Sequence, residues 1–498
     1  MDYPNSLSLP VLESVSLEYE ENSKLWDTID DLIIGGSRIN KKASKYLPKI
    51  PGERPEIYRN RLEKFTYHSI LGEAIDELSR KFLTSDINIT GLAENQNSVF
   101  TEYWKAFRHH GKKNLSNEMV IANQIFTDLI SYGKSYVHLE MNGESTQNIL
   151  TDIQNGYIPY ITIHHPNTVT NSGDGWFKLR ITDTINDRFS KPQNRVKWIF
   201  IDRQTIAVYS AIVEYSDTGT IAKILDGSEM IPVTDNTPIP LESIFEHGFS
   251  DIPLIEVSVS DKQWITHKAY LRQLEHLREL NNKHGINTML YIQRTFKPRV
   301  EKEEDLEFVT ETVDSTIESG NPYILDVEDF RFNEPNGNSS TTLLNSLNGI
   351  AAQIRSLYGL QGNIEETPGS LSRSGASKEM DFISVRDILD SFGGNIISAL
   401  DYIYGVVSDT IGYQRLSISG LSNFQVNILS SDIDSAIRVQ EVETQIAPTA
   451  LQLFYARISK ELVGSVSPEQ ETIIDTEIEN IFKAPILMLE SEKDKDSE

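Results

Sequence analysis

Hydrophobic residues recur every three or four positions in two long stretches of the second half of the chain, the spacing of amphipathic helices. The stripe of the first stretch, which ends at Tyr358, consists of Leu343, Leu347, Ile350, Ile354 and Leu357. The stripe of the second, from Ser377 to Val407, consists of Val385, Leu389, Phe392, Ile396, Leu400 and Ile403. Gly393 and Gly394 lie in the middle of the second helix, where we expect a kink.

Residues 359–376, between these two helices, have a different composition. Gly359, Gly362, Gly369, Gly375 and Pro368 stand among polar neighbours, which disfavours both helix and strand. A loop of this length inside a folded region usually has a function. We therefore predict a helix, a long loop and a kinked helix over residues 340–420.

The first half of the chain combines helical and β patterns, which indicates an α+β protein. Helical spacing predicts helices over 20–34, 56–82 and 115–132. Runs rich in β-branched and aromatic residues then predict an antiparallel sheet, with strands at 135–140, 160–164, 177–181, 196–201, 206–215 and 221–225. A polar helix follows over 261–284, and its narrow apolar stripe of Tyr270, Leu274 and Leu277 favours packing against like helices.

A strand, helix, strand unit is predicted next, with strands at 289–292 and 323–327 around a helix at 301–318. The helix carries many acidic residues, which form either a solvated face or a docking surface. Beyond residue 420 we predict one strand at 424–429 and three helices ending near 482. The charged tail from 489 onward is expected to be disordered.

Charge and composition exclude several classes of protein. The 498 residues carry a formal net charge of −27, which argues against a basic nucleic-acid reader and indicates either acidic solubility or a functional acidic surface. The chain has no cysteine, so disulfides and thiolate chemistry are excluded. No apolar run is long enough for a membrane span and no signal peptide is recognisable, so we expect synthesis in the cytoplasm and no membrane partner. The basic run Lys41, Lys42 and Lys45 is interpreted as a solvated loop.

No catalytic motif is present. The P-loop, the G-x-S-x-G and G-x-G-x-x-G patterns and H-E-x-x-H are all missing, and His267, His276 and His284 fall on different faces of one helix. We therefore expect no enzyme activity, no cofactor and no metal site. Adjacent carboxylates are attributed to chance among the 73 acidic residues.

Several short motifs, in their order along residues 40–485, resemble those of tailed-phage portal proteins. The motifs are YLPK at 46–49, YRNRLE at 58–63, KF at 81–82, the turn at 248–254, IAAQI at 350–354, YGL at 358–360 and SGASKE at 374–379. The resemblance implies a portal-like fold whose subunits form a ring, typically a homododecamer, with a central channel at one capsid vertex.

The resemblance also implies a division of the chain. Residues 1–55 would be an N-terminal arm, 56–260 the wing, 261–285 and 340–358 the two stem helices, and 286–339 the clip. Residues 359–376 would be the tunnel loop, 377–420 a kinked helix returning to the wing, 421–485 a helical crown and 486–498 an acidic tail.

Site residues and partners follow from this division. Near the DNA channel we expect Gly362, Asn363, Glu365, Glu366, Arg373 and Lys378. For the four charged residues among them, ion pairing with a neighbouring subunit is an equal alternative. Acidic walls would repel phosphate and let double-stranded DNA slide without sequence-specific binding. For docking at the clip we expect Glu303, Glu304, Glu307 and Glu311. The implied partners are the terminase large subunit, the head-completion adaptor, the major capsid protein and the scaffolding protein.

The function implied is that of a non-enzymatic conduit for genome packaging and ejection in the virion, which also nucleates procapsid assembly. Two other interpretations remain at this point. One is a different virion component, such as a connector or minor capsid protein. The other is a hydrolase built from scattered carboxylates.

Overall fold

The structure is a computed structural model that describes residues 3–91, 98–109, 118–141, 148–186, 192–216, 219–226, 229–234, 237–290, 294–298, 327–332, 338–360, 375–421, 424 and 476. The chain divides into two compact units, one of residues 1–367 and 383–424, the other of 368–382 and 425–498. Of the second unit, the structure describes only the start of one helix and residue 476.

Helices dominate the N-terminal region, in the order α1 (Leu9–Leu12), α2 (Leu17–Ile34), α3 (Gly36–Asn40), α4 (Ala43–Tyr46), α5 (Pro55–Glu63) and α6 (Ile70–Phe82). The helix predicted over 20–34 is confirmed as α2. The single helix predicted over 56–82 is wrong, because the chain leaves the helix between α5 and α6. Ser69 caps α6 by accepting a hydrogen bond from the Gly72 N–H, and its hydroxyl donates to the Leu32 carbonyl.

The basic run after α2 is not an unpaired solvated loop. Asp31, whose side chain is fully buried, accepts hydrogen bonds from Lys42 and from Arg38, each at 2.7 Å, and from the Tyr46 hydroxyl at 2.5 Å. Burial alone would raise the pKa of Asp31, but these hydrogen bonds outweigh it and hold the pKa below its usual value. The half-exposed lysines therefore neutralise a buried carboxylate.

The larger of the two main sheets is antiparallel and has the strand order β1-β11-β8-β7-β6-β5, with β9 beside β8 and β10 beside β9. Its bounds are β1 (Ser6–Ser8), β5 (Val169–Gly173), β6 (Trp176–Ile185), β7 (Gln193–Asp202), β8 (Thr205–Tyr215), β9 (Ile221–Asp226), β10 (Glu229–Pro232) and β11 (Pro238–Glu246). Trp198 and Tyr209 are paired across β7 and β8 and lie fully buried in its core. The four strands predicted in 177–225 are confirmed here.

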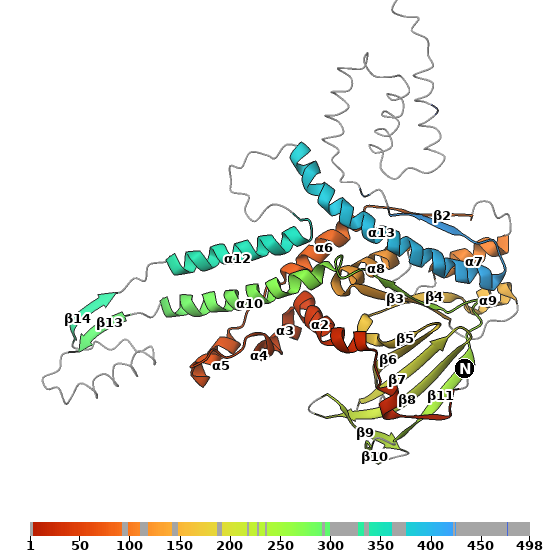
Figure 1. The fold of residues 1–498 in the computed structure, drawn as a ribbon, viewed down its shortest axis with the longest axis horizontal. Coiled ribbons are helices and arrows are strands. Elements are labelled where there is room, and N and C mark those ends of the chain that lie inside the picture. Colours follow the sequence, from red (N-terminus) through yellow and green to blue (C-terminus); the bar gives the residue numbers. More distant parts are fainter. Residues whose placement is uncertain are drawn as a thin grey trace, which may run out of the picture. The chain divides into compact units, whose positions relative to one another are not determined.

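A second, three-stranded sheet has the order β12-β3-β4 and is also antiparallel. It consists of β3 (Lys134–Met141), β4 (Pro159–His164) and β12 (Leu254–Ser258), and α8 (Glu118–Tyr132) leads directly into β3. The predicted β region thus forms two sheets rather than one, since 135–140 pairs with 160–164 on one side and with β12 on the other. Two helices that the sequence pattern missed, α7 (Ser98–His109) and α9 (Ile149–Asn155), lie beside each other and near this sheet (Figure 1).

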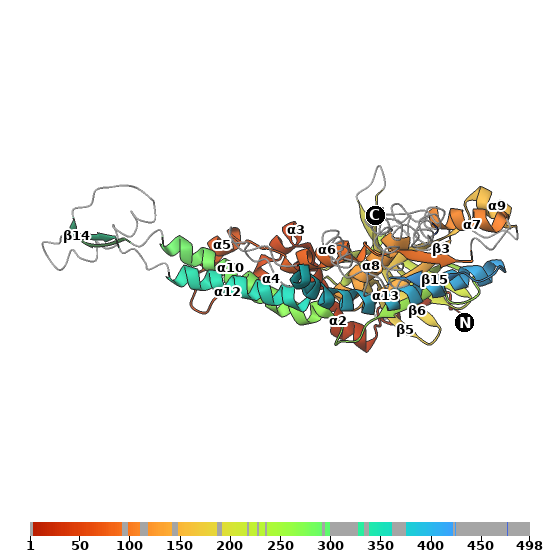
Figure 2. The ribbon, with the colours of Figure 1, turned by 90° about the horizontal axis from the view of Figure 1, so that it is seen from above.

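Two long helices, α10 (Ile265–Leu290) and α12 (Asn338–Leu357), lie side by side in both views (Figures 1 and 2). Along the chain they are separated by the antiparallel pair β13 (Arg294–Pro298) and β14 (Val327–Phe332). The strand predicted at 289–292 is wrong at Met289 and Leu290, because α10 extends past Gly285 to Leu290, and residues 291 and 292 lie outside the described residues. Of the second predicted strand, 323–327, only Val327 is described, and it begins β14. The helix predicted over 301–318 lies outside the described residues.

Helix α13 (Gly375–Ile411) is continuous, and its predicted apolar stripe from Val385 to Ile403 is buried throughout. The chain then returns in β15 (Ser417–Gly420), which pairs with β2 (Ile87–Thr90). Gly393 lies against Leu421, which follows β15, and a Cβ atom on Gly393 would overlap the Leu421 carbonyl oxygen. This glycine permits a close backbone approach, and the kink expected at Gly393 and Gly394 remains a prediction.

The α+β class expected from the sequence is confirmed. Among the described residues, none of the helices has the length together with the apolar character that a bilayer crossing requires. The strand and the three helices predicted between 424 and 482, and the tail from 489, lie outside the described residues, apart from Phe424 and Thr476.

Candidate functional site

The candidate site is the antiparallel helix pair α10 and α12 together with residues 358–360, which follow α12, and residues 383–411 of α13. Thr266, at the start of α10, and Tyr358, just past the end of α12, are linked by their hydroxyl groups at 2.6 Å. Both side chains are fully buried. Burial raises the pKa of Tyr358, so this phenol is neutral and remains a hydrogen-bonding group at neutral pH.

Helix α12 ends in a Schellman motif that fixes the start of the long segment after it. The Leu360 N–H donates to the Arg355 carbonyl at 2.9 Å and the Gly359 N–H donates to the Ser356 carbonyl at 3.0 Å. Gly359 has a φ of +71°, and a Cβ atom there would press on the backbone of Ser384 and Val385 in α13. The loop predicted over 359–376 is wrong at both ends, because Gly359 and Leu360 are packed and residues 375 and 376 belong to α13, while 361–374 lie outside the described residues.

Helix α10 has a narrow apolar stripe because several of its buried positions are polar. The Gln273 side chain accepts from the Ile70 and Leu71 N–H groups and donates to the His68 carbonyl. Asn281 accepts from the Thr66 N–H and donates to the Thr66 carbonyl. Packing of the stripe against like helices of other subunits stays a prediction. Within the chain α10 lies beside α12, and these two amides hold the 66–71 segment, which enters α6.

One ion pair attaches α12 to the body of the unit. Arg355 contacts Glu77 of α6 at 2.7 Å, and Lys81, one turn further along α6, contacts the same carboxylate at 3.1 Å. Burial would raise the pKa of Glu77, but hydrogen bonds and charge from Lys81 and Arg355 lower it overall. The pair is thus ionised at neutral pH and positions the last turn of α12.

Several large apolar side chains on these helices face solvent in the isolated chain. Leu271 of α10 is 60% exposed and Leu344 of α12 is 42% exposed, and Leu357 of α12 and Ile383 of α13 are exposed as well. Leu357 belonged to the predicted buried stripe, but the stripe ends in buried Tyr358 instead. The stripe positions Leu347, Ile350 and Ile354 are buried as expected, and Leu343 is only partly buried.

The residues predicted for the channel and for docking fall mostly beyond what the structure describes. This holds for Gly362, Asn363, Glu365, Glu366, Arg373, Glu303, Glu304, Glu307 and Glu311. Lys378 lies in the first turns of α13, in the second unit, and only its backbone is described. Gly393 is buried and Gly394 exposed in the middle of the same helix.

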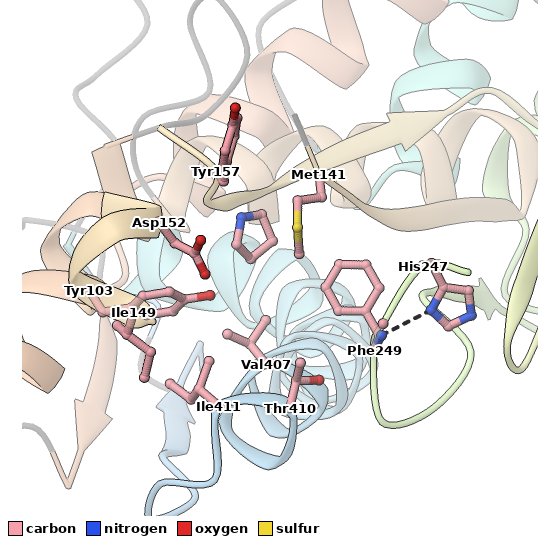
Figure 3. A pocket seen from close by; sticks show the side chains of 12 residues that line it. Tyr103, Met141, Ile149, Asp152, Tyr157, His247, Phe249, Val407, Thr410 and Ile411 are labelled. Carbon is pink, nitrogen blue, oxygen red and sulfur yellow. Dashed lines mark hydrogen bonds between the residues drawn. The ribbon is translucent and has the colours of Figure 1, made fainter. Parts of the chain in front are cut away.

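A separate pocket of about 330 Å³ opens between α7, α9, the ends of β3 and β4, and α13 (Figure 3). It is lined by Tyr103, Met141, Ile149, Asp152, Tyr157, Pro159, His247, Gly248, Phe249, Val407, Thr410 and Ile411. Asp152 is the single carboxylate in this lining. His247 uses both ring nitrogens, accepting from the Phe249 N–H and bonding the Asp202 carbonyl, each at 3.1 Å. These residues do not assemble the pair of carboxylates that a glycosidase-type hydrolase requires.

The smaller sheet also brings together groups that the linear spacing of histidines did not reveal. His138, Glu140 and His164 come from neighbouring strands, and their ligand atoms all lie within 4.8 Å of one another. No metal site was expected from the sequence, because the third ligand is separated from the other two by 24 residues or more. The signal that could have indicated it is the alternation of His138 and Glu140 on one face of a strand, opposite a second strand that carries His164.

Comparisons with known proteins identify no family. No protein-family model matches the chain, and no curated protein matches it. Among the solved structures that are similar to it, two chains align at 10% identity. One comes from "Virion of native gene transfer agent (GTA) particle", with a TM-score of 0.35 over 88% of this chain and 98% of that chain. The other comes from "Neck of empty GTA particle computed with C6 symmetry", with a TM-score of 0.38 over 82% of this chain and 95% of that chain. Similarity at this level does not establish a shared fold.

Proposed function

We propose that the chain is a portal protein of a phage-type particle, a non-enzymatic subunit of a ring at one capsid vertex. The observation that carries the proposal is the order and pairing of the elements around the helix pair. A mixed body of helices and sheets leads into α10, a strand pair and the antiparallel α12 follow, and residues 361–374 then precede the long α13. This is the order of parts that the sequence resemblance implies for a portal subunit.

In this proposal α10 and α12 are the two stem helices, and the first stem helix extends to Leu290 rather than to 285. The clip comprises residues 291–337 and includes β13 and β14. The tunnel loop is shortened to 361–374, since Tyr358, Gly359 and Leu360 are packed. The two sheets and their helices form the wing, and residues from about 425 to 485 the crown.

Exposed apolar side chains support contacts between subunits. Leu271 and Leu344 lie on the two stem helices and are largely exposed in the single chain. A ring of identical subunits buries a patch of each copy against the next one through a heterologous interface. We assign these leucines to that interface, which would add burial to helices whose opposite sides contact their own chain.

The ring would conduct DNA without binding it tightly. A net charge of −27 per subunit makes the assembled ring strongly acidic, and acidic walls repel phosphate instead of retaining it through counterion release. Glu365 and Glu366 would face the channel, with Arg373 and Lys378 as local positive groups. The energy for packaging would come from the terminase large subunit docked at the clip, where Glu303, Glu304, Glu307 and Glu311 would contact it and later the adaptor.

The test is the mass and shape of the purified protein, measured by light scattering and negative-stain microscopy. The proposal expects a ring with a central hole, of about twelve subunits of 56.4 kDa each. If the protein is a monomer, the measurement is repeated after coexpression with scaffolding and capsid proteins, where a ring must form. A compact dimer or tetramer without a channel under both conditions contradicts the proposal.

A further inference from the structure

We propose that His138, Glu140 and His164 form a binding site for a divalent transition-metal ion, with Zn²⁺ as the preferred ion. The three residues lie on two paired strands in the middle and at the edge of the β12-β3-β4 sheet. In the β3-β4 register, Tyr136 is opposite His164, His138 is opposite Thr162 and Glu140 is opposite Tyr160. Residues two apart on a strand share a face, so all three candidate ligands project from one face of the sheet.

The distances between the ligand atoms fit a zinc ion. His138 Nδ1 lies 3.1 Å from His164 Nε2 and 3.3 Å from Glu140 Oε1, and His164 Nε2 lies 3.8 Å from Glu140 Oε1. The point equidistant from the three atoms is about 2 Å from each of them, which is the length of a Zn–N or Zn–O bond. The spacing of the three ligand atoms therefore suits a single bound ion.

The surroundings of the cluster hold the ligands in position. Tyr160 donates its hydroxyl hydrogen to Glu140 Oε2 at 2.6 Å, which leaves Oε1 directed at the two histidines. A hydrogen bond of this kind to the outer oxygen of a coordinating carboxylate is a usual feature of metal sites. The exposed side-chain fractions are 8% for His138, 10% for His164 and 23% for Glu140, so the cluster is largely buried but open to solvent on the glutamate side.

The buried imidazole of His138 makes its polar contacts on the side of the cluster. Its Nε2 atom is buried and has no hydrogen-bond partner among the described residues, so the polar contacts of this ring run through Nδ1, toward Glu140 and His164. A divalent cation between the three ligand atoms would satisfy Nδ1, His164 Nε2 and the carboxylate together. Two imidazoles and a carboxylate are a ligand set suited to Zn²⁺, with a water molecule in the open fourth position.

The ion would act as a structural link between β3 and β4. Strand β3 is the central strand of its sheet, and β12, its other neighbour, leads toward α10. An ion bound only in the folded state stabilises that state by mass action. We therefore expect Zn²⁺ to raise the melting temperature of the protein, and the site requires no catalytic role.

The experiment measures zinc content and affinity in the full chain after exhaustive removal of metal. Wild type is expected to retain one Zn²⁺ per chain after titration and dialysis, to compete with a chromophoric chelator, and to give the visible absorption of tetrahedral Co²⁺ when cobalt replaces zinc. His164→Gln and Glu140→Gln are each expected to lower the affinity for Zn²⁺ at least tenfold. Tyr160→Phe should lower it by about tenfold, as expected for loss of an outer hydrogen bond.

The matched control is His68→Gln. His68 forms an exposed pair with Glu73 at 2.7 Å, but within the described part of the chain no third ligand joins these two side chains, so this variant should bind Zn²⁺ as wild type does. Circular dichroism and thermal melting in the presence of chelator check that each variant folds. If His164→Gln does not fold, the comparison rests on Glu140→Gln. Absence of stoichiometric Zn²⁺, or equal affinity in wild type and both ligand variants, overturns the proposal.

Discussion

The hydroxyl groups of Thr266 and Tyr358 meet at 2.6 Å and join the start of α10 to the end of α12. Because both residues are fully buried, neither hydroxyl can exchange this bond for water. The bond therefore holds the two helices in their antiparallel arrangement at the end where the chain enters residues 361–374.

Removing this bond should destabilise the protein measurably. Tyr358→Phe leaves the Thr266 hydroxyl without a partner, and we expect a loss of about 1–2 kcal/mol in the free energy of unfolding, measured by urea denaturation. Thr266→Val removes the same bond from the other side. The double variant should lose less than the sum of the two single variants, and strict additivity would show that the hydroxyls do not interact.

Alanine substitutions at Gly393 and Gly394 test the close approach of α13 to Leu421, with Gly394 as the control. Gly394 is exposed, and a Cβ atom added there would meet open space, so Gly394→Ala should stabilise α13 by about 0.5–1 kcal/mol. Gly393→Ala should instead destabilise the protein by about 1–3 kcal/mol, because the new Cβ overlaps the Leu421 carbonyl oxygen. Urea unfolding measures both, and a gain in stability from both variants would contradict the close approach.

The buried Asp31 should make stability depend on pH at the acid end. Its pKa is lower in the folded than in the unfolded state, so its stabilisation is present above about pH 4 and is lost as the pH falls through the folded-state pKa. Asp31→Asn should cost about 3 kcal/mol at pH 7, since it leaves Lys42 and Arg38 without the buried charge. The difference from wild type should shrink below about pH 4 in melting experiments. Asp27→Asn, at an exposed position on the same helix, should change little at any pH.

The buried carboxyl group of Asp128 should make stability depend on pH in the opposite direction. Burial raises its pKa to about 7, although hydrogen bonds from Ser135 and Gln124 act against that shift. The folded state therefore keeps a proton that the unfolded state has released, so stability falls as the pH rises from about 4 through 7, by up to about 1.4 kcal/mol per pH unit. Asp128→Asn should remove this slope and be more stable than wild type at pH 8. Parallel pH curves for the two proteins would exclude this role.

The proposed ring predicts a surface variant that assembles poorly but folds normally. Leu271→Glu places a charge at an exposed position of α10, so the melting temperature of the single chain should hardly change. The same charge within a subunit interface should abolish or strongly reduce ring formation in light scattering. Leu17→Glu, on the exposed surface of α2, is the matched control and should leave assembly intact. Rings of normal mass from Leu271→Glu would exclude this part of α10 from the interface.

Local periodicity was sufficient to predict the elements that bury one regular face. The stripe from Val385 to Ile403 in α13 and the β-branched runs of β6, β7 and β8 appear in the structure as expected. In these elements each residue's environment depends mainly on its own helix or strand, so spacing along the chain carries the information.

Elements that depend on distant partners could not be predicted in the same way. The break between α5 and α6 depends on Tyr67 and Ser69, which both donate to the Leu32 carbonyl. Strand β11 was missed because Pro238 and Pro240 argue against a central strand. Residues 238–240 of β11, which include both prolines, pair with β1 only, and the pairing of β11 with β8 begins at Leu241. Each half of β11 therefore has a neighbouring strand on one side only.

The same limit applies to the candidate site. The polar character of α10 was visible in the sequence, but the partners of Gln273 lie about 200 positions earlier in the chain. His138, Glu140 and His164 likewise meet only through strand pairing. Most of the proposed channel and docking residues lie outside the described residues, so their roles stay predictions.

The amides of Gln273 and Asn281 have a consequence for how this protein can evolve. Both hold the 66–71 segment through its main-chain atoms, and main-chain atoms are the same whichever side chains the segment carries. Mutations at the exposed positions Thr66 and His68 that preserve the backbone path are therefore free to accumulate, while the two amides on α10 are not. Diverged descendants of this chain should retain an amide at each of these two positions even after Thr66 and His68 have been replaced.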